Sequence, residues 1–285
     1  MNTSEIKIED RLLAKYTNEH SKWIEISGIP VHYRDEGEGD VLILLHGSFS
    51  SLHTFDDWTR ILKHNFRIIR LDVPGFGLTG PAKSNNYSIE LFIEFLDQFT
   101  KSLHINRFYL AGSSLGGWLS WEFAINNPDK VMKLILINSA GYIDRNNFPL
   151  PFLIAQTPVL RNVFSFTPKA VVRRFVRQVF YDQSKVTEDV VDRYYDIFQR
   201  EGNKKAFVQF ANTRFTQNTN SLNDLVMPVL IQWGKEDRWL NVENAYKFQE
   251  AIPTNQLIIY DETGHLPMEE CPQQSAEDVM QFLMN

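Results

Sequence analysis

Ser114 is the side chain with the clearest chemical potential, because it stands at the centre of the segment GSSLGG at positions 112–117. The segment follows the apolar run Arg107–Ala111 and opens the helical pattern Leu115–Asn126. In this strand–turn–helix setting, a G-x-S-x-G motif presents a serine hydroxyl at the edge of a sheet. We therefore predict that Ser114 is a nucleophile, whereas Ser113 occupies a filler position of the motif.

A serine hydroxyl is a weak nucleophile and needs a base to take its proton. Among the seven histidines, His265 fits best because it lies between Gly264 and Pro267, in a loop after the last strand-like run. His46 is the main rival, but its place before a glycine at the end of another run suits a residue that anchors a loop. His53 is a weaker candidate for a place near a pocket mouth; a surface or helix-start position fits it better.

The base needs an acidic group that holds its tautomer and stabilises the imidazolium. Asp237 follows the apolar run Val229–Trp233 and gives the chain order serine, aspartate, histidine. Alternatives are Asp144, Glu236 and Asp261, of which Asp261 suits a turn at a strand end. We predict Asp237 as the acid from its position.

The negative charge that develops on an attacked carbonyl oxygen needs backbone N–H donors. Leu115 follows the nucleophile directly and supplies one donor at the start of a helix, where free N–H groups favour negative charge. The second donor should come from the loop after the run Val41–Leu45. We predict the N–H of Ser48 for this role, with that of Phe49 as the fallback.

No metal or organic cofactor is expected. The glycine-rich segment DVPGFG at positions 72–77 lacks the Lys-Ser/Thr ending of a phosphate loop, so we expect it to shape the wall beside the oxyanion loop. Cys271 is the single cysteine, and no Cys/His spacing resembles a zinc site.

These residues follow strand-like runs that alternate with helical patterns, which predicts an α/β fold with a largely parallel sheet. Apolar runs without polar alternation suit strands that are buried on both faces. After a hairpin at 23–26 and 30–34, they cover residues 41–45, 67–71, 107–111, 131–138, 229–233 and 256–260. Helical patterns cover residues 88–103, with Ser88 as the N-cap, and residues 115–126, 242–252 and 273–284.

Residues 141–222 interrupt this alternation with helical patterns such as Lys169–Tyr181 and Val186–Arg200. We therefore predict a helical cap at 141–222, inserted between core segments 1–140 and 223–285. Its large apolar side chains either fasten the cap to the core or line a pocket over Ser114, and both readings stay open. They are Phe148, Phe152, Leu153, Phe164, Phe166, Phe175, Phe180, Tyr194, Tyr195 and Phe198.

The bulk properties favour a small-molecule substrate. With 29 Lys plus Arg against 35 Asp plus Glu, the net charge is −6, which disfavours nucleic acid as a partner. No polybasic run or apolar run of about 18 residues points to a membrane. The N-terminal residues carry charges where a signal peptide is apolar, so together with the single thiol we expect a cytoplasmic protein.

Together the motifs resemble the capped α/β-hydrolase family from about residue 23 to the C-terminus, although the cap matches only in type. The resemblance implies a doubly wound, mostly parallel eight-stranded sheet with helices on both faces and a helical cap. Family members that attack halides or epoxides carry aspartate at the nucleophile position, so Ser114 disfavours both activities. We expect a carboxylesterase-like serine hydrolase that cleaves a small, apolar ester through an acyl-enzyme.

Two alternatives remain. One is a carbon–carbon bond hydrolase of ring-cleavage products, and the other is a small-molecule sensor that retains the triad. Family members that cleave carbon–carbon bonds often bind the substrate acid with a cap arginine. Arg173, Arg174 and Arg177 are candidates for that role, although a solvated helix face is the favoured explanation for them.

Overall fold

The computed structural model describes residues 3–82, 87–142, 149–157, 167–213 and 218–285. At its centre lies an eight-stranded sheet with the order β1-β2-β4-β3-β5-β6-β7-β8. The strands are β1 (Ser21–Ile26), β2 (Ile29–Glu36), β3 (Val41–Leu45), β4 (Arg67–Leu71), β5 (Phe108–Ser113), β6 (Val131–Ile137), β7 (Val229–Gly234) and β8 (Asn255–Tyr260). The β1–β2 and β2–β4 pairs are antiparallel and the others are parallel, so the predicted opening hairpin and mostly parallel sheet are confirmed.

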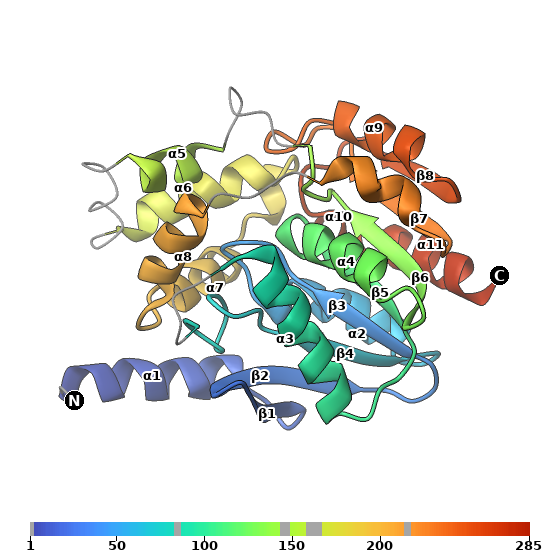
Figure 1. The fold of residues 1–285 in the computed structure, drawn as a ribbon. Coiled ribbons are helices and arrows are strands. Elements are labelled where there is room, and N and C mark those ends of the chain that lie inside the picture. The colour runs from blue at the N-terminus through green and yellow to red at the C-terminus, as the bar shows by residue number, and fades with distance from the viewer. Residues whose placement is uncertain (1–2, 83–86, 143–148, 158–166, 214–217) are drawn as a thin grey trace.

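Helices cover both faces of the sheet (Figure 1). One face carries α3 (Ile89–Ser102), α4 (Leu115–Asn126) and α9 (Glu243–Ala251). The other carries α2 (Asp56–Leu62), α10 (Pro267–Glu270) and α11 (Pro272–Met284), of which α2 and α11 contact each other. The central strands β3 to β7 are therefore buried on both faces, which explains their largely apolar sequences, whereas the edge strands β1 and β8 keep exposed residues.

Local sequence explains where the core helices begin and which face they bury. In α3, Phe92, Leu96 and Phe99 are buried at the spacing of one helix face. The Ser88 side chain accepts a hydrogen bond from the N–H of Leu91 at 3.4 Å, as expected of an N-cap. Fully burying each such apolar side chain contributes about 1.5–3 kcal/mol to the free energy of unfolding.

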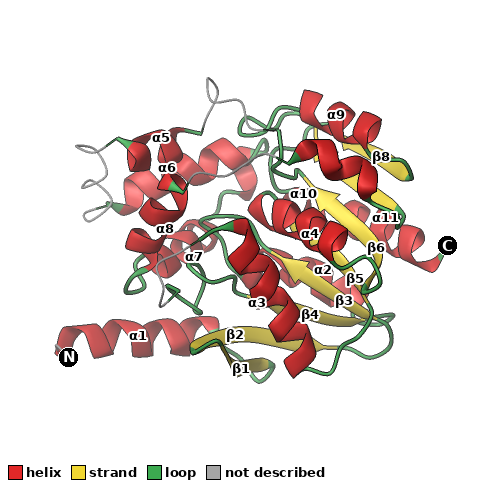
Figure 2. Ribbon diagram, viewed as in Figure 1, coloured by secondary structure: helices red, strands yellow, loops and turns green. Residues whose placement is uncertain are grey.

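Between β6 and β7 the described residues contain helices and no strand. We call α5 (Leu150–Gln156), α6 (Lys169–Val179), α7 (Glu188–Phe198) and α8 (Asn203–Asn212) the helical insertion. The insertion lies beyond the ends toward which the parallel strands point (Figure 2). The helical patterns at 169–181 and 186–200 correspond to α6 and α7, each of which ends two residues earlier.

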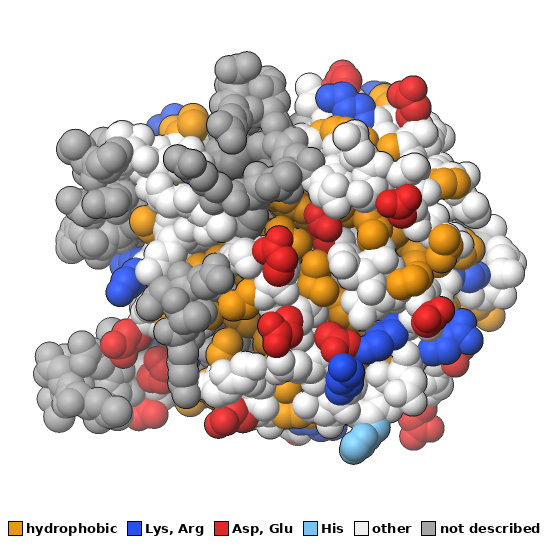
Figure 3. Space-filling view, in the orientation of Figure 1, with side chains coloured by type: hydrophobic (Ala, Val, Ile, Leu, Met, Phe, Trp, Pro, Cys, Tyr) orange, Lys and Arg blue, Asp and Glu red, His pale blue; other side chains and the backbone are white. Residues whose placement is uncertain are grey.

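The sequence reasoning missed α1 (Thr3–Tyr16), which extends from the body of the molecule in Figure 1. Its last turn is attached to the insertion, because Tyr16 Oη and Lys15 Nζ donate hydrogen bonds to Asp196 of α7 at 2.9 and 2.8 Å. Within the described ranges, no helix has the length and apolar character needed to cross a membrane. On the face drawn in Figure 3, the coloured Lys and Arg side chains are scattered among Asp and Glu and form no continuous basic surface.

Candidate active site

Ser114 lies in the turn between β5 and α4 with a φ of 55° and a ψ of −115°. This backbone conformation is strained for a residue with a side chain and persists only where the surroundings enforce it. Here the N–H of Ser114 donates to the carbonyl of Ile137 at 3.0 Å, and its own carbonyl accepts from Ala140 at 2.9 Å. The turn therefore holds the serine at the end of the sheet by hydrogen bonds to the last residue of β6 and to the segment that follows it.

The glycines of the motif are required by close packing. A Cβ on Gly112 would lie 2.1 Å from the carbonyl oxygen of Gly116, and one on Gly116 would lie 2.1 Å from that of Leu45. Both distances are far below van der Waals contact, and the obstructing atoms are backbone. The steric reason for the glycines that flank Ser114 is therefore present in the structure.

His265 and Asp237 form a buried pair. The Nδ1 atom of His265 lies 2.6 Å from Oδ2 of Asp237. Because an ionised carboxylate only accepts hydrogen bonds, Nδ1 carries the proton and Nε2 is left as a proton acceptor. Ser114 and His265 line the same pocket, so the structure brings the three predicted residues into one site.

The orientation of Asp237 is fixed by further hydrogen bonds. Its Oδ1 accepts from the N–H groups of Trp239 and Leu240 at 2.7 and 3.0 Å, and its Oδ2 accepts from Asn138 Nδ2 at 2.7 Å. The sequence reasoning missed Asn138, although a polar residue at the end of an apolar run beside β7 was a usable signal. Asn138 and the two N–H groups thus aim Asp237 at the imidazole of His265.

The loop after β3 passes close to Ser114. A Cβ on Gly47 would lie 3.0 Å from Ser114 Cβ and 3.6 Å from its Oγ. Ser48 and Phe49 line the pocket, and no described residue accepts a hydrogen bond from either N–H. The N–H of Leu115, at the start of α4, has no partner within the helix. The N–H groups of Ser48 and Leu115 remain the predicted oxyanion donors.

His46 is arranged as an anchor for this loop. Its Nε2 accepts a hydrogen bond from the N–H of Val73 at 3.0 Å, and its Nδ1 donates to the carbonyl of Gly47 at 2.7 Å. Full burial lowers the pKa of His46 and favours the neutral ring. With both ring nitrogens engaged, His46 joins the loop after β3 to the DVPGFG segment.

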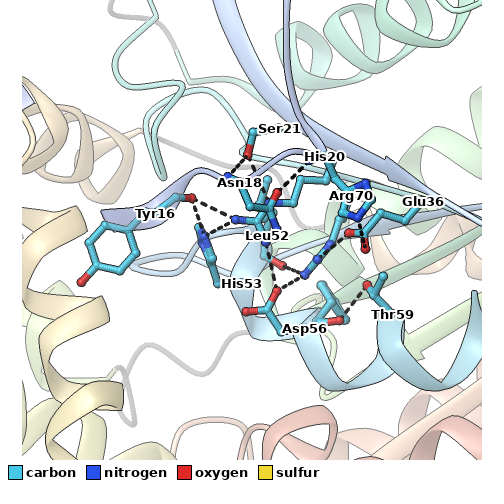
Figure 4. Close-up of polar contacts among 12 residues, drawn as sticks. Tyr16, Asn18, His20, Ser21, Glu36, Leu52, His53, Asp56, Thr59 and Arg70 are labelled. Atoms are coloured by element: carbon cyan, nitrogen blue, oxygen red, sulfur yellow. Dashed lines mark hydrogen bonds and ion pairs between the residues drawn. The ribbon is translucent and has the colours of Figure 1, made fainter. Parts of the chain in front are cut away.

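An ionic network around the buried Arg70 holds the chain that follows the loop after β3 (Figure 4). Arg70 donates to Glu36 at 2.8 Å, to the carbonyl of Leu52 at 3.3 Å and to Asp56. The N–H of Leu52 donates in turn to Asp72 Oδ1 at 2.7 Å. These contacts fix the 3₁₀ turn Leu52–Phe55 against β2 and β4.

His53 belongs to the same network. Its Nε2 donates to the carbonyl of Tyr16 at 2.9 Å (Figure 4), and its Nδ1 accepts from the hydroxyl of Ser51 at 3.0 Å. Burial lowers the pKa of His53 to about 4. The expected surface position is wrong, since only 6% of His53 is exposed, whereas its place at a helix start is confirmed.

The alternative acids face other partners. Glu236 Oε2 accepts the N–H of Thr263 at 3.0 Å, and Asp261 pairs with Lys235 at 2.5 Å on the surface. Asp144 lies outside the described residues. Within the part of the chain that the structure describes, Asp237 is the carboxylate that contacts the His265 ring.

The pocket over Ser114 has a volume of about 620 Å³, counted with the open space at its mouth. Helix α6 contributes an apolar wall to it, and none of the described lining residues is Lys, Arg, Asp or Glu. The described lining residues are Gly47, Ser48, Phe49, Ser50, Thr54, Ser113, Ser114, Val172, Phe175, Val176, Val179, Tyr194, Phe198, Trp239, His265 and Leu266.

The large apolar residues of the insertion divide between the two expected roles. Phe175, Tyr194 and Phe198 line the pocket. Phe152 packs against the rings of Phe49, Phe207 and Phe210 instead, Phe180 is buried outside the lining, Tyr195 packs on the core, and Leu153 is exposed. Phe148, Phe164 and Phe166 lie outside the described residues.

None of the three candidate arginines lines the pocket. Arg173 forms an ion pair with Glu188 at 2.5 Å, while Arg174 and Arg177 are exposed. The sequence reasoning missed Arg193 of α7, which donates to Glu269 at 2.6 Å.

Glu269 connects this arginine to the pocket wall. It also accepts hydrogen bonds from the hydroxyls of Thr54 and Tyr194, which line the pocket, at 2.5 and 3.1 Å. The charge of Arg193 is therefore balanced by a carboxylate before any substrate binds. In the described parts of the chain, no group of three or more His, Cys, Asp or Glu is placed to hold a metal ion.

Known proteins resemble this chain over most of its length. It is 28% identical over 254 residues to an uncharacterized hydrolase, YugF, of Bacillus subtilis, covering 88% of this chain and 92% of that one. It is also 28% identical over 258 residues to a 2-hydroxy-6-oxo-2,4-heptadienoate hydrolase of Pseudomonas putida, covering 87% and 90%.

Solved structures share the fold. A bacterial membrane phospholipase A superposes with a TM-score of 0.81 at 22% identity, over 98% of this chain and 92% of that one. A meta-cleavage product hydrolase from Pseudomonas fluorescens superposes with a TM-score of 0.79 at 23% identity, over 92% and 97%. A family model described as alpha/beta hydrolase fold matches residues 40–272, and this chain therefore belongs to that family, as a hydrolase with the character of a serine enzyme.

Proposed function

We propose that this chain is a serine esterase that hydrolyses a small, uncharged and largely apolar carboxylic ester, with Ser114, His265 and Asp237 as its triad. The observation that carries the proposal is the pocket itself. Its described lining places apolar side chains of α6 beside Ser114 and His265 and includes no Lys, Arg, Asp or Glu. In this proposal residues 141–222 act as a cap that covers the bound ester.

The proposed reaction begins when Ser114 Oγ attacks the ester carbonyl carbon while His265 Nε2 takes the hydroxyl proton. Asp237 stabilises the imidazolium, and the N–H groups of Leu115 and Ser48 bind the oxyanion. The intermediate collapses with transfer of the proton to the leaving alcohol, which leaves an acyl-enzyme. Water that loses its proton to His265 then attacks the acyl carbon and releases the acid.

The pairing of Arg193 supports an uncharged substrate. Its guanidinium is hydrogen-bonded to Glu269 and does not line the pocket, so it offers no unpaired positive charge to an ionised group on a substrate. Bringing a carboxylate into the apolar pocket without a free cation costs several kcal/mol of desolvation. The charge distribution therefore favours esters over ring-cleavage acids.

The relatives favour a second candidate, carbon–carbon bond hydrolysis, more than they favour ester hydrolysis. Besides the Pseudomonas putida protein, a relative from Cupriavidus pinatubonensis with 26% identity over 264 residues is named a 2-hydroxy-6-oxononadienedioate/2-hydroxy-6-oxononatrienedioate hydrolase. In that reaction the same serine would attack a ketone carbonyl. The two candidates therefore share the triad and differ in what the pocket must bind.

Turnover of matched substrates separates these candidates. We expect p-nitrophenyl butyrate to exceed 2-hydroxy-6-oxo-2,4-heptadienoate in kcat/KM by at least about tenfold, with both activities lost in Ser114→Ala. A dienoate that is the better substrate would establish the carbon–carbon candidate instead. Labelling of Ser114 by a fluorophosphonate without turnover of either substrate would favour a sensor that retains the triad.

A further inference from the structure

A buried carboxylate outside the triad joins the helical insertion to the loop that carries the general base. Glu270, at the end of α10, is 3% exposed. Its Oε1 accepts the N–H of Gly264, the residue before His265, at 2.7 Å. Its Oε2 accepts the N–H groups of Tyr181 and Asp182, just after α6, at 2.8 and 3.0 Å.

The main chain makes a second link between the same two segments. The N–H of His265 donates to the carbonyl of Val179, the last residue of α6, at 2.7 Å. The contact leaves no room for a side chain, since a Cβ on Gly264 would lie 2.5 Å from that carbonyl oxygen and 2.8 Å from Glu270 Oε1. The end of α6 therefore lies directly on the backbone of the histidine loop.

A carboxylate in such a place has to be explained, because burial without partners would disfavour its charged form. Burial raises the pKa of Glu270, while the N–H groups of Asp182, Gly264 and Tyr181 act against that rise. Those donors come from both sides of the junction. The charge of Glu270 is thus used to hold two separate segments of backbone together.

We propose that Glu270 is a positioning residue through which α6 sets the place of His265 relative to Ser114. The proposal rests on the assignment of His265 as the general base. Val176 and Val179 of α6 also line the pocket. The helix that would contact the substrate is therefore connected by hydrogen bonds to the loop that carries the base, so a shift of α6 would also shift His265. Small displacements of a base reduce the rate of proton transfer strongly, whereas they leave substrate contacts largely intact.

The substitution Glu270→Gln tests this, because an amide has the same size but one acceptor oxygen. Its NH₂ group must face the N–H donors of either Gly264 or Tyr181, which opens one side of the junction. We expect kcat to fall at least about tenfold with KM changed less than about twofold, equally for p-nitrophenyl acetate and butyrate. The matched control is Glu122→Gln in α4, a buried glutamate that is bonded to Trp118 Nε1 and should keep wild-type kinetics.

A second background shows whether Glu270 acts through the imidazole. In a His265→Ala enzyme no base remains to be positioned, so adding Glu270→Gln should change the residual rate less than about twofold. The rate of Ser114 labelling by a fluorophosphonate gives the same comparison without any assumption about the substrate. The labelling rate therefore tests the role of Glu270 even if the protein turns out not to be an esterase.

An equal loss in both backgrounds, or an unchanged kcat in Glu270→Gln, would overturn the proposal. A loss that grows from acetate to butyrate would overturn it too, since it would mean that Glu270 only shapes the acyl wall. If the glutamine variant does not fold, Glu270→Asp replaces it in both backgrounds. That variant keeps the charge with a shorter reach, and we expect its kcat to lie between those of Glu270→Gln and the wild type.

Discussion

The carboxylate of Asp237 accepts hydrogen bonds at both oxygens and so has one orientation toward His265. In Asp237→Asn the remaining oxygen is held by the N–H groups of Trp239 and Leu240, which turns the new NH₂ toward His265 Nδ1. The ring must then carry its proton on Nε2, where it cannot accept one from Ser114. We expect kcat to fall on the order of 10⁴-fold, as in serine protease triads.

Steady-state kinetics on the purified Asp237→Asn variant, with circular dichroism to verify folding, measure this effect. Glu236→Asn provides a neighbouring control outside the His265 contact. If Asp237→Asn kept a near-normal kcat while Asp144→Asn lost most of its kcat, Asp144 would be the acid of the triad in place of Asp237.

Ser113 offers a contrasting prediction beside the nucleophile. Its hydroxyl is fully buried and has no hydrogen-bond partner among the described residues, which is unfavourable for a polar group. Ser113→Ala should therefore keep Ser114 labelling and raise the free energy of unfolding by about 1 kcal/mol. Chemical denaturation measures the free energy of unfolding, and a fluorophosphonate probe measures labelling of Ser114. Loss of labelling in Ser113→Ala would mean that Ser114 had been wrongly assigned as the nucleophile.

The sequence alone was sufficient to propose Ser114, His265 and Asp237, because each follows a strand-like run and parallel strands end at one edge. Their supporting partners were not predictable in the same way. Asn138 is hydrogen-bonded to Asp237, which lies 99 residues later in the sequence, and Arg193 is hydrogen-bonded to Glu269, 76 residues later. Such pairs depend on how the loops after strands fold and on how each helix is rotated, which residue spacing does not determine.

The rotation of α6 illustrates the point. Its buried stripe is Val172, Phe175, Val176 and Val179, so Arg174 and Arg177 fall on the opposite, exposed face. The spacing predicted the helix, but not that its apolar face would line a pocket. Strands were easier to predict because burial on both faces leaves a continuous apolar run. Helix α1 was missed because charged residues surround Leu12 and Tyr16, which are buried in the part of this helix whose side chains are described.

The apolar face of α6 predicts how the enzyme responds to acyl length. Each buried methylene should add up to about 0.8 kcal/mol of binding, or about fourfold in kcat/KM. In a p-nitrophenyl ester series, kcat/KM should rise from acetyl to butyryl or hexanoyl and then fall as the pocket fills. A profile that is flat or falls from acetyl onward would mean that these side chains serve only as structural packing.

Replacing one wall residue should move this optimum. Phe198→Ala enlarges the pocket and should shift the best ester toward longer acyl groups by one or two methylene pairs. Leu153→Ala in α5 is the matched control, because Leu153 is 43% exposed and does not line the pocket. The same ester series on both variants measures the shift, and an identical optimum in Phe198→Ala would contradict the assigned wall.

Across the molecule, His53 connects α1, the core and the insertion. Its ring donates to the carbonyl of Tyr16, and its own carbonyl accepts from Arg193 of α7 at 3.3 Å. Protonation of His53 would place a charge in a buried site beside Arg34 and Arg193. Burial, reinforced by these two arginines, lowers its pKa to about 4, from 6.5 in an exposed histidine.

The sign of the resulting pH dependence follows from proton binding. Between pH 6.5 and 4, His53 is protonated in the unfolded chain but stays neutral in the folded protein. The free energy of unfolding therefore decreases as the pH falls through this window. The loss should approach ~3 kcal/mol for a shift of this size. His53→Gln, which keeps a donor for the Tyr16 carbonyl, should flatten the decline in unfolding free energy between these pH values.

His64→Gln, at an exposed residue, is the control for this experiment and should keep the wild-type slope. Urea denaturation at pH 4.0, 5.0, 6.0 and 7.5 compares the three proteins. A slope in His53→Gln that equals that of the wild type would show that other groups cause the acid destabilisation.

The most direct test of the central claim is to identify the residue that becomes covalently attached during the reaction. The protein is treated with a fluorophosphonate, digested and sequenced by mass spectrometry, beside Ser114→Ala and Ser113→Ala. We predict one adduct per chain on Ser114, its absence in Ser114→Ala and its persistence in Ser113→Ala. Full labelling of Ser114→Ala would contradict the assignment of Ser114 and the mechanism built on it.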